Sequence, residues 1–317
     1  MPTFVSVIIA TRNRRALLAR TLDALLRQRW PADRFEIVVA DNGSTDATRV
    51  IVERAAARPS APCIRYLFVD RPGKSHAVNA ALGLARGDIL AFTDDDVRPD
   101  PAWLESIVDA LAQEGPAFVA GRVLPEWETA PPPWVSPAVY GVLAIPDNGT
   151  RRIDIVDRSA DVMPIGTNMA VRRAVVERVG GLRTDLGKIE GSFRTGEDHE
   201  FFLRMLDAGC RGVYEPDAVV HHWVPAARLD RRYFRKWLYQ NGRDVARLES
   251  SYPDSRRRVL GVPGHLWRQA ASDACAATRE AVRGDCARRF AATARLQWLG
   301  GYLRESWLGS LDVPQAG

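Results

Sequence analysis

The sequence predicts an α/β fold, with a mixed, mostly parallel sheet flanked by helices and a helical extension at the C-terminal end. In the first half of the chain, short apolar runs alternate with amphipathic stretches, which is the pattern of βα units around a parallel sheet. Beyond Arg228 the strand pattern stops, and bulky aromatic residues serve as anchors of expected helices. We therefore expect an α/β domain over residues 1–226 and a helical C-terminal extension over residues 227–317.

The first four strands are expected at apolar runs that end in polar residues. Leu18 and Leu22 recur at helical spacing after the first run, and Asn42-Gly43-Ser44 forms a turn into a helix after the second. A glycine turn and a further helix follow the third run. The expected strands are residues 5–10, 35–40, 64–69 and 89–93, followed by a helix over 102–113 and a strand over 118–123.

The pattern changes at Pro125. From there to Asp161 the chain is rich in proline and aromatic residues and has no clear periodicity. An irregular stretch of this length inside a compact domain is usually a functional lid or a binding loop. The α/β pattern then resumes, with helices expected over residues 174–179 and 197–208 and strands over 212–214 and 218–223.

Composition places the chain among ordinary globular proteins. It has 317 residues, of which 46% are hydrophobic and 26% charged. Its four cysteines are scattered and form no C-x-x-C pair, which predicts reduced thiols in a cytoplasmic protein. The chain opens directly on a strand pattern, without a signal segment. The longest uncharged stretch, residues 129–146, contains five prolines, so we expect a loop there and not a membrane-spanning helix.

A local excess of positive charge lies at the start of the extension. Residues 228–258 contain ten Lys and Arg against four Asp and Glu. Basic and aromatic residues interleave in the run from Arg231 to Trp237, which suits a helix lying on an anionic membrane surface. The alternatives are a solvated helical face and, for Trp237, a place in the core. No nucleic-acid-binding signature accompanies the charge, so no nucleic-acid partner is expected.

Three consecutive carboxylates follow the fourth expected strand. Asp94, Asp95 and Asp96 come directly after the apolar run 89–92. This position puts them at the carboxyl edge of the sheet, where open α/β proteins bind ligands. Crowded carboxylates repel one another unless a cation lies among them, and hard oxygen ligands suit Mg²⁺ or Mn²⁺ with a phosphate completing the shell. The alternative is a solvated acidic turn in which Asp96 or Asp100 caps the next helix.

Polar residues also follow the other strands, and jointly they describe a site for a nucleotide diphosphate with a metal ion. A carboxylate after the second strand can accept hydrogen bonds from a base or ribose, and a glycine turn before a helix lets the backbone approach phosphate. Individual residues such as Thr11 and Ser44 can instead be helix caps. No phosphate-loop, G-x-G-x-x-G or H-E-x-x-H motif is present. The site candidates from this pattern are Thr11, Arg12, Asn13, Asp41, Arg71, Gly73, Lys74 and the three aspartates.

These segments resemble glycosyltransferase family 2. The resemblance covers roughly residues 3–225, with the motifs in order and at normal spacing. It is carried by the opening strand through Arg14, the segment 39–46, the glycine loop from Gly73 to Ala81, and the D-x-D motif at 92–96. It continues through the acceptor-side segment Gly166-Thr167-Asn168-Met169-Ala170, the x-E-D motif Gly196-Glu197-Asp198, and the histidines His221 and His222.

The family implies a GT-A fold, a nucleotide-sugar donor, most often a UDP-sugar, and transfer with inversion at the anomeric carbon. In this resemblance Asp198 is the general base that deprotonates the acceptor hydroxyl. Its place in the first turn of an expected helix predicts that the helix dipole keeps it ionised at neutral pH. Asp94 and Asp96 hold ribose and the metal ion, Mn²⁺ or Mg²⁺. Adjacent strand residues point to opposite faces, so one histidine reaches the metal, and the family pattern favours His222 over His221.

The remaining site roles follow from the same resemblance. The nucleotide is expected to contact Thr11, Arg12, Asn13, Asp41, Gly73, Lys74, Asn79, Asp94 and Asp95. The acceptor is expected to contact Trp134, Gly166, Thr167, Asn168 and Glu197. Trp134 is included because flat aromatic faces stack on sugar rings, although it can equally pack the loop onto the core.

Two other functional classes compete with this interpretation. A sugar-nucleotide nucleotidyltransferase has similar metal and diphosphate needs, but usually opens with a glycine-rich loop after the first strand, where this chain has Thr11-Arg12-Asn13-Arg14. A non-catalytic module that binds a nucleotide sugar is the second. The expected location is cytoplasmic, with a peripheral position on the inner membrane face as the alternative. The absence of an export segment argues against a processive synthase. The acceptor class stays open between glycan, lipid-linked and small-molecule compounds.

Overall fold

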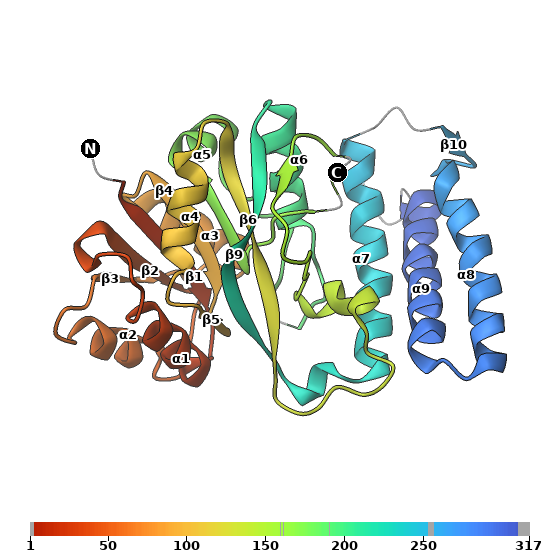
Figure 1. Ribbon diagram of the computed structural model, residues 1–317, viewed down its shortest axis with the longest axis horizontal. Coiled ribbons are helices and arrows are strands. Elements are labelled where there is room, and N and C mark those ends of the chain that lie inside the picture. The colour runs from red at the N-terminus through yellow and green to blue at the C-terminus, as the bar shows by residue number, and fades with distance from the viewer. Residues whose placement is uncertain (1–2, 159, 161, 190, 253–256, 310–317) are drawn as a thin grey trace, which may run out of the picture. The chain divides into compact units, whose positions relative to one another are not determined.

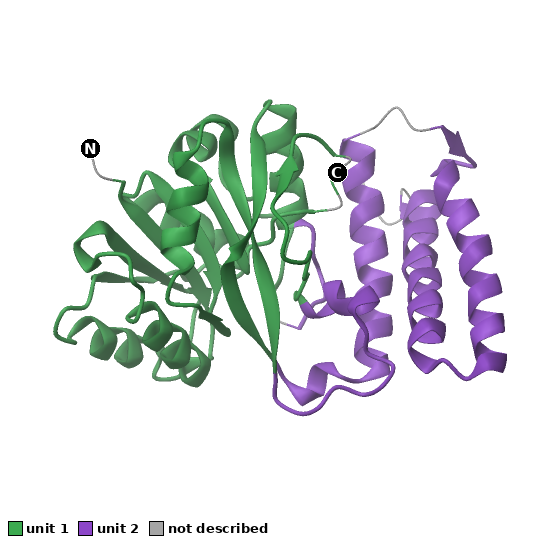
Figure 2. Ribbon diagram, in the orientation of Figure 1, with its two compact units in different colours: residues 1–126, 144–190, 197–223 green, residues 127–143, 191–196, 224–317 purple. Residues whose placement is uncertain are grey.

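A computed structural model describes residues 3–158, 160, 162–189, 191–252 and 257–309. The chain forms two compact units, drawn in green and purple in Figure 2. Unit 1 comprises residues 1–126, 144–190 and 197–223, and unit 2 comprises residues 127–143, 191–196 and 224–317. Two segments that precede the predicted extension, 127–143 and 191–196, thus belong to unit 2. The domain boundary near residue 226 stays a prediction.

Unit 1 is built on one mixed sheet (Figure 1) with the strand order β3-β2-β1-β4-β8-β6-β9-β5, and β7 pairs with β9. The first four strands are parallel, as the βα pattern predicts, and β8 joins β4 in the antiparallel direction. The strands are β1 (Val5–Thr11), β2 (Phe35–Asp41), β3 (Cys63–Phe68), β4 (Ile89–Asp94), β5 (Val97–Pro99), β6 (Pro116–Trp127), β7 (Ile153–Ile155), β8 (Asn168–Arg172) and β9 (Arg211–Val224).

The parallel register fixes which residues lie at the ligand edge of the sheet. Thr11 at the end of β1 is opposite Asp41 at the end of β2, and Ala10 is opposite Asp94 at the end of β4. Because parallel strands end at the same edge, three polar strand ends that are far apart in sequence become neighbours. This register positions the candidate site.

The helices of unit 1 follow the predicted βα pattern. Helix α3 packs against β1 and β2, and its Ala77 and Ala81 contact a core that includes Ile8 and Val38. Strand residues of that core alternate with residues that point to the other face, as the two-residue period of a strand requires. The helices are α1 (Arg15–Leu25), η1 (Ala32–Arg34), α2 (Thr48–Ala56), α3 (Lys74–Leu84), α4 (Trp103–Ala112), α5 (Arg173–Val179) and α6 (Glu197–Asp207).

The strand predictions need two corrections. The two strands expected over 212–214 and 218–223 are one strand, β9, which pairs with β7 near its start and with β5 near its end. The short strands β5, β7 and β8 are absent from the expectation, and β7 lies in the stretch 125–161 that was expected to be irregular. Five residues or fewer carry too little alternation to be recognised.

Unit 2 is mainly helical, as predicted, with α9 packed against both α7 and α8 (Figure 1). Helices α7 and α9 approach closely at Gly242 and Gly301, where an added Cβ would lie 2.0 Å from a backbone oxygen of the facing helix. The elements are η2 (Pro137–Leu143), η3 (Ala226–Arg228), α7 (Arg231–Ser251), α8 (Gly264–Arg283) and α9 (Cys286–Leu308), with a hairpin of β10 (Arg258–Val259) and β11 (Val262–Pro263). Among the described residues, none of these helices is both long enough and apolar enough to cross a bilayer.

The β10–β11 hairpin interrupts a stretch that was expected to be wholly helical. Residues 253–256, which belong to the predicted basic stretch 228–258, lie outside the described residues. In the basic-aromatic run of α7 the four basic side chains are exposed, Phe234 is fully buried and Trp237 is half-buried. Trp237, for which a place in the core was the alternative, is thus only partly covered, and membrane contact by this run stays a prediction.

Candidate functional site

The three aspartates lie in unit 1 where β4 ends and the chain turns into β5. Asp95 and Asp96 are buried, with 4% and 6% of their surface exposed, so the alternative of a solvated acidic turn is wrong. A buried carboxylate must be neutralised or hydrogen-bonded, because removing its charge from water is costly. Each of the three finds its partners on other strands and helices.

Asp94 is held between a cation and a hydroxyl. The Nζ atom of Lys74, at the start of α3, lies 2.6 Å from Oδ1, and the Thr167 hydroxyl donates to Oδ2 at 2.8 Å. Burial acts to raise the pKa of Asp94, but the Lys74 ammonium outweighs it, and the pKa is lowered from its ordinary value. Lys74 in turn has a raised pKa, against the effect of burial, because Asp94 and Asp198 both attract its charge. Asp94 is therefore ionised in the folded protein.

Arg14 bridges the other two carboxylates. Its Nη1 atom lies 2.9 Å from Asp95 Oδ1 and 2.8 Å from Asp96 Oδ2, while the Thr11 hydroxyl donates to Asp95 Oδ2 at 2.7 Å. Burial and the charge of Asp96 nevertheless raise the pKa of Asp95 to about 6. The sequence reasoning missed Arg14 as a site residue. The signal was present, since Arg14 ends the polar run that follows the first strand.

His222 and His221 point to opposite sides of β9, as their adjacent positions predict. His222 is paired in register with Val97, and its Nε2 atom lies 3.3 Å from Asp96 Oδ1. His221 Nε2 instead lies 3.1 Å from Asp100 Oδ1. His222 is only 2% exposed, and its Nδ1 atom is a buried polar atom with no hydrogen-bond partner in the described part of the chain. Of the two histidines, His222 thus joins the aspartates.

Asp198 and Glu197 lie at the start of α6, next to the acceptor-side segment. The backbone N–H of Gly166 donates to Asp198 Oδ2 at 2.8 Å, and an added Cβ at Gly166 would lie 3.0 Å from Oδ1. Glycine at position 166 therefore lets the backbone approach the carboxylate closely. This contact unites two motifs that are 32 residues apart.

Burial affects the pKa of both carboxylates at the start of α6. Burial raises the pKa of Asp198, with the Lys74 cation and the Gly166 amide acting in the opposite direction. Burial and the neighbouring Asp198 raise the pKa of Glu197 to about 7. The positive charge of Lys74, at the start of α3, stabilises negative charge in this part of the site.

The nucleotide-side candidates form a network between the ends of β1, β2 and β3. Asp41 accepts hydrogen bonds from the Ser44 backbone at 2.8 Å and from the Tyr66 hydroxyl at 2.8 Å. Asn13, with a positive φ of 52°, accepts from the Thr45 backbone at 2.8 Å. Arg12 lies half-buried in the bend after β1. Together these contacts hold the polar edge of the sheet in one arrangement.

The glycine loop is tied to the same edge. The N–H of Gly73, which has a positive φ of 123°, donates to the Asn42 side chain at 2.8 Å, and α3 begins with Lys74 directly after it. A φ in this region favours glycine, which explains the residue before the helix. The structure therefore brings Gly73 and Lys74 to the ends of β2 and β4.

Asn79 and Asn168, which were expected to contact ligands, form hydrogen bonds with other residues of unit 1. The Asn79 amide binds the Leu182 backbone in both directions, at 2.7 and 2.8 Å, which leaves it a structural role. Asn168 is 1% exposed, donates to the carbonyls of Arg122 and Ala218, and accepts from the indole of Trp103. Its hydrogen-bonding capacity is used in joining strands and helix α4, so we place no ligand on it.

Trp134 belongs to unit 2 and is buried there. Its ring centroid lies 5.1 Å from that of Phe234 and 4.3 Å from that of Phe290, and the Arg231 guanidinium lies 5.5 Å from it. With 8% of its surface exposed, the ring has no open face for a sugar. The packing alternative for Trp134 therefore describes the structure.

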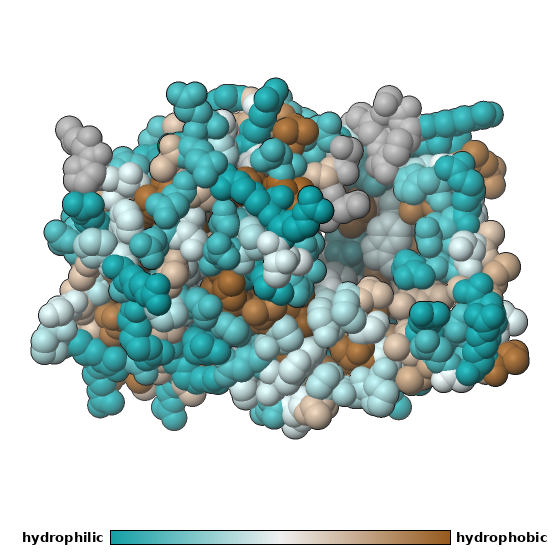
Figure 3. All heavy atoms as spheres, in the orientation of Figure 1, coloured by the Kyte–Doolittle hydropathy of each residue, from teal (hydrophilic) through white to brown (hydrophobic). Residues whose placement is uncertain are grey.

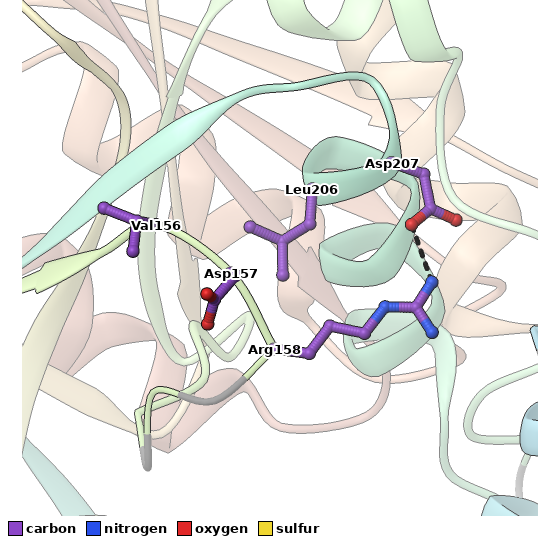
Figure 4. A pocket seen from close by; sticks show the side chains of 5 residues that line it. All are labelled: Val156, Asp157, Arg158, Leu206 and Asp207. Carbon is purple, nitrogen blue, oxygen red and sulfur yellow. Dashed lines mark hydrogen bonds and ion pairs between the residues drawn. The ribbon is translucent and has the colours of Figure 1, made fainter. Parts of the chain in front are cut away.

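A surface cavity of about 400 Å³ lies apart from these residues. It is lined by Val156, Asp157, Arg158, Leu206 and Asp207, and Figure 4 shows Arg158 reaching Asp207 at its rim. None of the predicted site residues lines it. Within the described residues, no group of three or more His, Cys, Asp or Glu side chains is arranged to hold a metal ion.

Comparison with known proteins identifies the family and the fold. Residues 6–180, more than half of the chain, match the sequence model described as "Glycosyl transferase family 2". A mannosyltransferase from Pyrobaculum calidifontis, solved with GDP-Man and Mn²⁺, superposes with a TM-score of 0.65 at 22% identity, covering 97% of this chain and 88% of that one. Staphylococcus aureus TarS 1–349, solved with UDP-GlcNAc, gives a TM-score of 0.55 at 17% identity, covering 96% and 90%. At these identities the likeness shows the fold alone, and it confirms the predicted GT-A fold.

Curated relatives also carry glycosyltransferase names. Validoxylamine A glucosyltransferase of Streptomyces hygroscopicus subsp. jinggangensis is 41% identical over 117 residues, which are 36% of this chain and 27% of the relative. Glycosyltransferase AglE of Haloferax volcanii is 29% identical over 234 residues, 73% of this chain and 71% of the relative. The pre-mycofactocin glycosyltransferase of Mycobacterium tuberculosis is 28% identical over 266 residues, 83% and 51%. The chain thus spans about a quarter of the first relative and about half of the third.

Proposed function

Since the chain belongs to glycosyltransferase family 2, we propose that it is an inverting enzyme that uses a nucleotide-sugar donor, with a UDP-sugar favoured. The sugar passes to a hydroxyl group of a glycan, a lipid-linked compound or a small molecule. The observation that carries the proposal is the position of Lys74, whose Nζ atom lies 2.6 Å from Asp94 Oδ1 and whose charge Asp198 also attracts. A donor-side acid and an acceptor-side acid thus share one cation within unit 1.

In this proposal Asp198 is the general base. Inversion requires attack by a hydroxyl oxygen, which is a poor nucleophile until a base accepts its proton. The Gly166 amide holds one carboxylate oxygen of Asp198, which fixes the orientation of the group. Burial and the charge of Asp198 raise the pKa of Glu197 to about 7, so Glu197 is largely protonated below that pH.

The other residues bind and position the donor. Lys74 and Arg14 supply positive charge at the edge of the sheet where a diphosphate would lie. Asp41, oriented by Tyr66, can accept hydrogen bonds from a base or ribose. The solved neighbours from P. calidifontis and S. aureus hold GDP-Man and UDP-GlcNAc, which supports a nucleotide-sugar donor for this chain.

The acidic edge fits a divalent ion, Mn²⁺ or Mg²⁺, with two ligands from the protein. An octahedral ion with bonds of about 2.1 Å places adjacent ligands about 3.0 Å apart. The 3.3 Å between Asp96 Oδ1 and His222 Nε2 is close to that spacing. Asp94 is a third candidate, at present bonded to Lys74, so donor phosphates and water would complete the shell. When bound, the ion supplies positive charge that neutralises the leaving diphosphate.

The proposal is tested by exchanging Asp198 for asparagine. Asp198→Asn should lower kcat about 10²–10⁴-fold, because the proton acceptor is lost, while donor affinity measured by calorimetry stays unchanged. Asp207→Asn, at the exposed end of the same helix, is the matched control and should keep wild-type kcat. Activity is followed as release of nucleoside diphosphate from a panel of nucleotide sugars with Mn²⁺ present.

Three outcomes would contradict the proposal. Full activity of Asp198→Asn would contradict the assignment of Asp198 as the general base. Donor binding that survives thorough chelation of divalent ions would contradict the role of the metal ion. Release of pyrophosphate from a nucleoside triphosphate, in place of a nucleoside diphosphate from a sugar donor, would favour a nucleotidyltransferase.

A further inference from the structure

The tip of the β10–β11 hairpin in unit 2 exposes apolar side chains to solvent. Val259 is 48% exposed and Leu260 is 74% exposed. The end of α9 adds Trp307, 49% exposed, and Leu308, 46% exposed. In Figure 3 brown and teal atoms lie side by side at the upper right, where Figure 1 shows β10. Contiguous exposed apolar surface rimmed by polar groups marks an interaction site more often than isolated apolar residues do.

Two indole rings connect the hairpin to the ends of α8 and α9. Trp267 Nε1 donates to the Val259 carbonyl at 3.1 Å, and Trp307 Nε1 donates to the Leu260 carbonyl at 2.9 Å. The two rings stack with centroids 6.2 Å apart. The hairpin, the start of α8 and the end of α9 therefore form one continuous surface, the hairpin patch, made of Val259, Leu260, Trp267, Trp307 and Leu308.

The backbone at the tip is a second, independent observation. Leu260 and Gly261 both have positive φ, 53° and 76°, which is the geometry of a two-residue type I′ turn. Asparagine followed by glycine is favoured there, and a bulky residue with positive φ is uncommon. Leucine at this position thus has an unfavourable backbone conformation and exposes its side chain. Such a cost points to a function for the side chain, not for the fold.

The segment that carries the hairpin patch has a positive net charge. The described residues 257–309 contain nine arginines and four acids. Three of these acids are buried and paired with arginine, namely Asp273 with Arg295, Glu280 with Arg279, and Glu305 with Arg243. Arg257, next to the hairpin, and Arg258, in β10, are exposed, and Arg258 also lies 3.6 Å from Glu249 and donates to the Gly261 carbonyl. An apolar tip beside arginines is complementary to a surface with negative headgroups over an apolar interior.

We propose that the hairpin patch anchors this protein to an anionic membrane surface. Leu260 and Val259 enter the boundary between headgroups and acyl chains, Trp267 and Trp307 lie at the headgroup level, and Arg257 and Arg258 bind lipid phosphates. This assigns the contact to the hairpin; in the run Arg231 to Trp237, by contrast, Phe234 is part of the core. The inference does not depend on the proposed enzymatic function.

The experiment uses the full chain and the variant Leu260→Asn. Asparagine-glycine is the preferred type I′ sequence, so this variant should fold at least as stably as the wild type while removing the apolar tip. Binding is measured by co-sedimentation with phosphatidylcholine vesicles that contain or lack phosphatidylglycerol. We expect the wild type to bind the anionic vesicles and not the neutral ones, and Leu260→Asn to bind them about tenfold more weakly.

The matched control is Val282→Gln. Val282 is 88% exposed near the other end of α8, about 27 Å along the helix from its start, and should not contribute to lipid binding. Equal loss of binding in both variants, wild-type binding by Leu260→Asn, or no binding of the wild type to anionic vesicles would overturn the proposal. Light scattering tests whether the hairpin patch is instead a contact between two copies of this chain. A wild-type dimer that becomes monomeric in Leu260→Asn, without lipid binding, would make the patch a contact between copies and would also overturn it.

Discussion

Replacing Glu197 by glutamine should stabilise the folded protein in alkaline solution and have little effect in acid. Glu197 is 8% exposed, and burial, followed by the charge of Asp198, raises its pKa from 4.5 to about 7. The folded state therefore resists ionisation of this side chain. Glutamine has nearly the same shape and carries no charge at any pH, so it removes that cost.

The size and sign of the effect follow from proton linkage. Between pH 4.5 and about 7 the unfolded chain releases the Glu197 proton and the folded chain retains it, so stability falls as pH rises through this window. The contribution of the protonated group is fully present below pH 4.5 and lost above about pH 7. At about 1.36 kcal/mol per pH unit, the gap between the two pKa values corresponds to about 3 kcal/mol. Glu197→Gln should gain up to this amount at about pH 8.5.

Urea unfolding at about pH 4.5 and about pH 8.5 measures the effect, with chelator present and no donor, so that no ligand changes the charge of the site. Glu177→Gln is the matched control, because Glu177 is exposed on helix α5 and should show no pH-dependent gain. A Glu197→Gln protein that gains the same free energy at both pH values would refute the reasoning. So would one that is less stable than the wild type at the higher pH.

Two further predictions concern hydrogen bonds to buried carboxylates. Tyr66→Phe removes the hydroxyl that lies 2.8 Å from Asp41. It should weaken donor binding measured by calorimetry and lower the free energy of unfolding by about 1 kcal/mol. Unchanged donor affinity would contradict the role of Asp41. Asp244→Ala in unit 2 leaves the backbone N–H and the hydroxyl of Thr195 without their acceptor. It should lower the free energy of unfolding in urea by about 1–3 kcal/mol. Asp244→Asn keeps one acceptor oxygen and should lower it by less. Equal losses in the two Asp244 variants would show that packing, not hydrogen bonding, holds the segment.

The sequence alone determined the elements whose signal is local. Apolar runs that end in polar residues predicted the four parallel strands. For β1, β2 and β4 the reason is burial on both faces of the sheet, which requires such runs. The parallel arrangement then implied that Thr11, Asp41 and Asp94 meet at one edge, and the register confirms this. The alternation of adjacent strand residues likewise separated His222 from His221. In each case the information lies within a few residues of the chain.

The tertiary structure decided how polar side chains are used. Asn168 and Asn79 carry the same groups whether they bind a ligand or the backbone, and only packing showed that both bind the protein. The same holds for Trp134, which is buried between aromatic rings of helices more than 90 residues later in the chain. Sequence patterns cannot assign such partners, because the contacts join segments that are distant along the chain.

The ionisation of the buried side chains was also decided by the tertiary structure. The first-turn position of Asp198 predicted a carboxylate stabilised by its helix, yet burial raises its pKa, and Lys74 opposes that rise from another helix. Arg14 similarly acquires its role from two aspartates that are more than 80 residues away. The sequence thus determined which charges gather at the edge of the sheet. Their depth below the surface and their partners, which set the energy of each charge, depend on the folded arrangement alone.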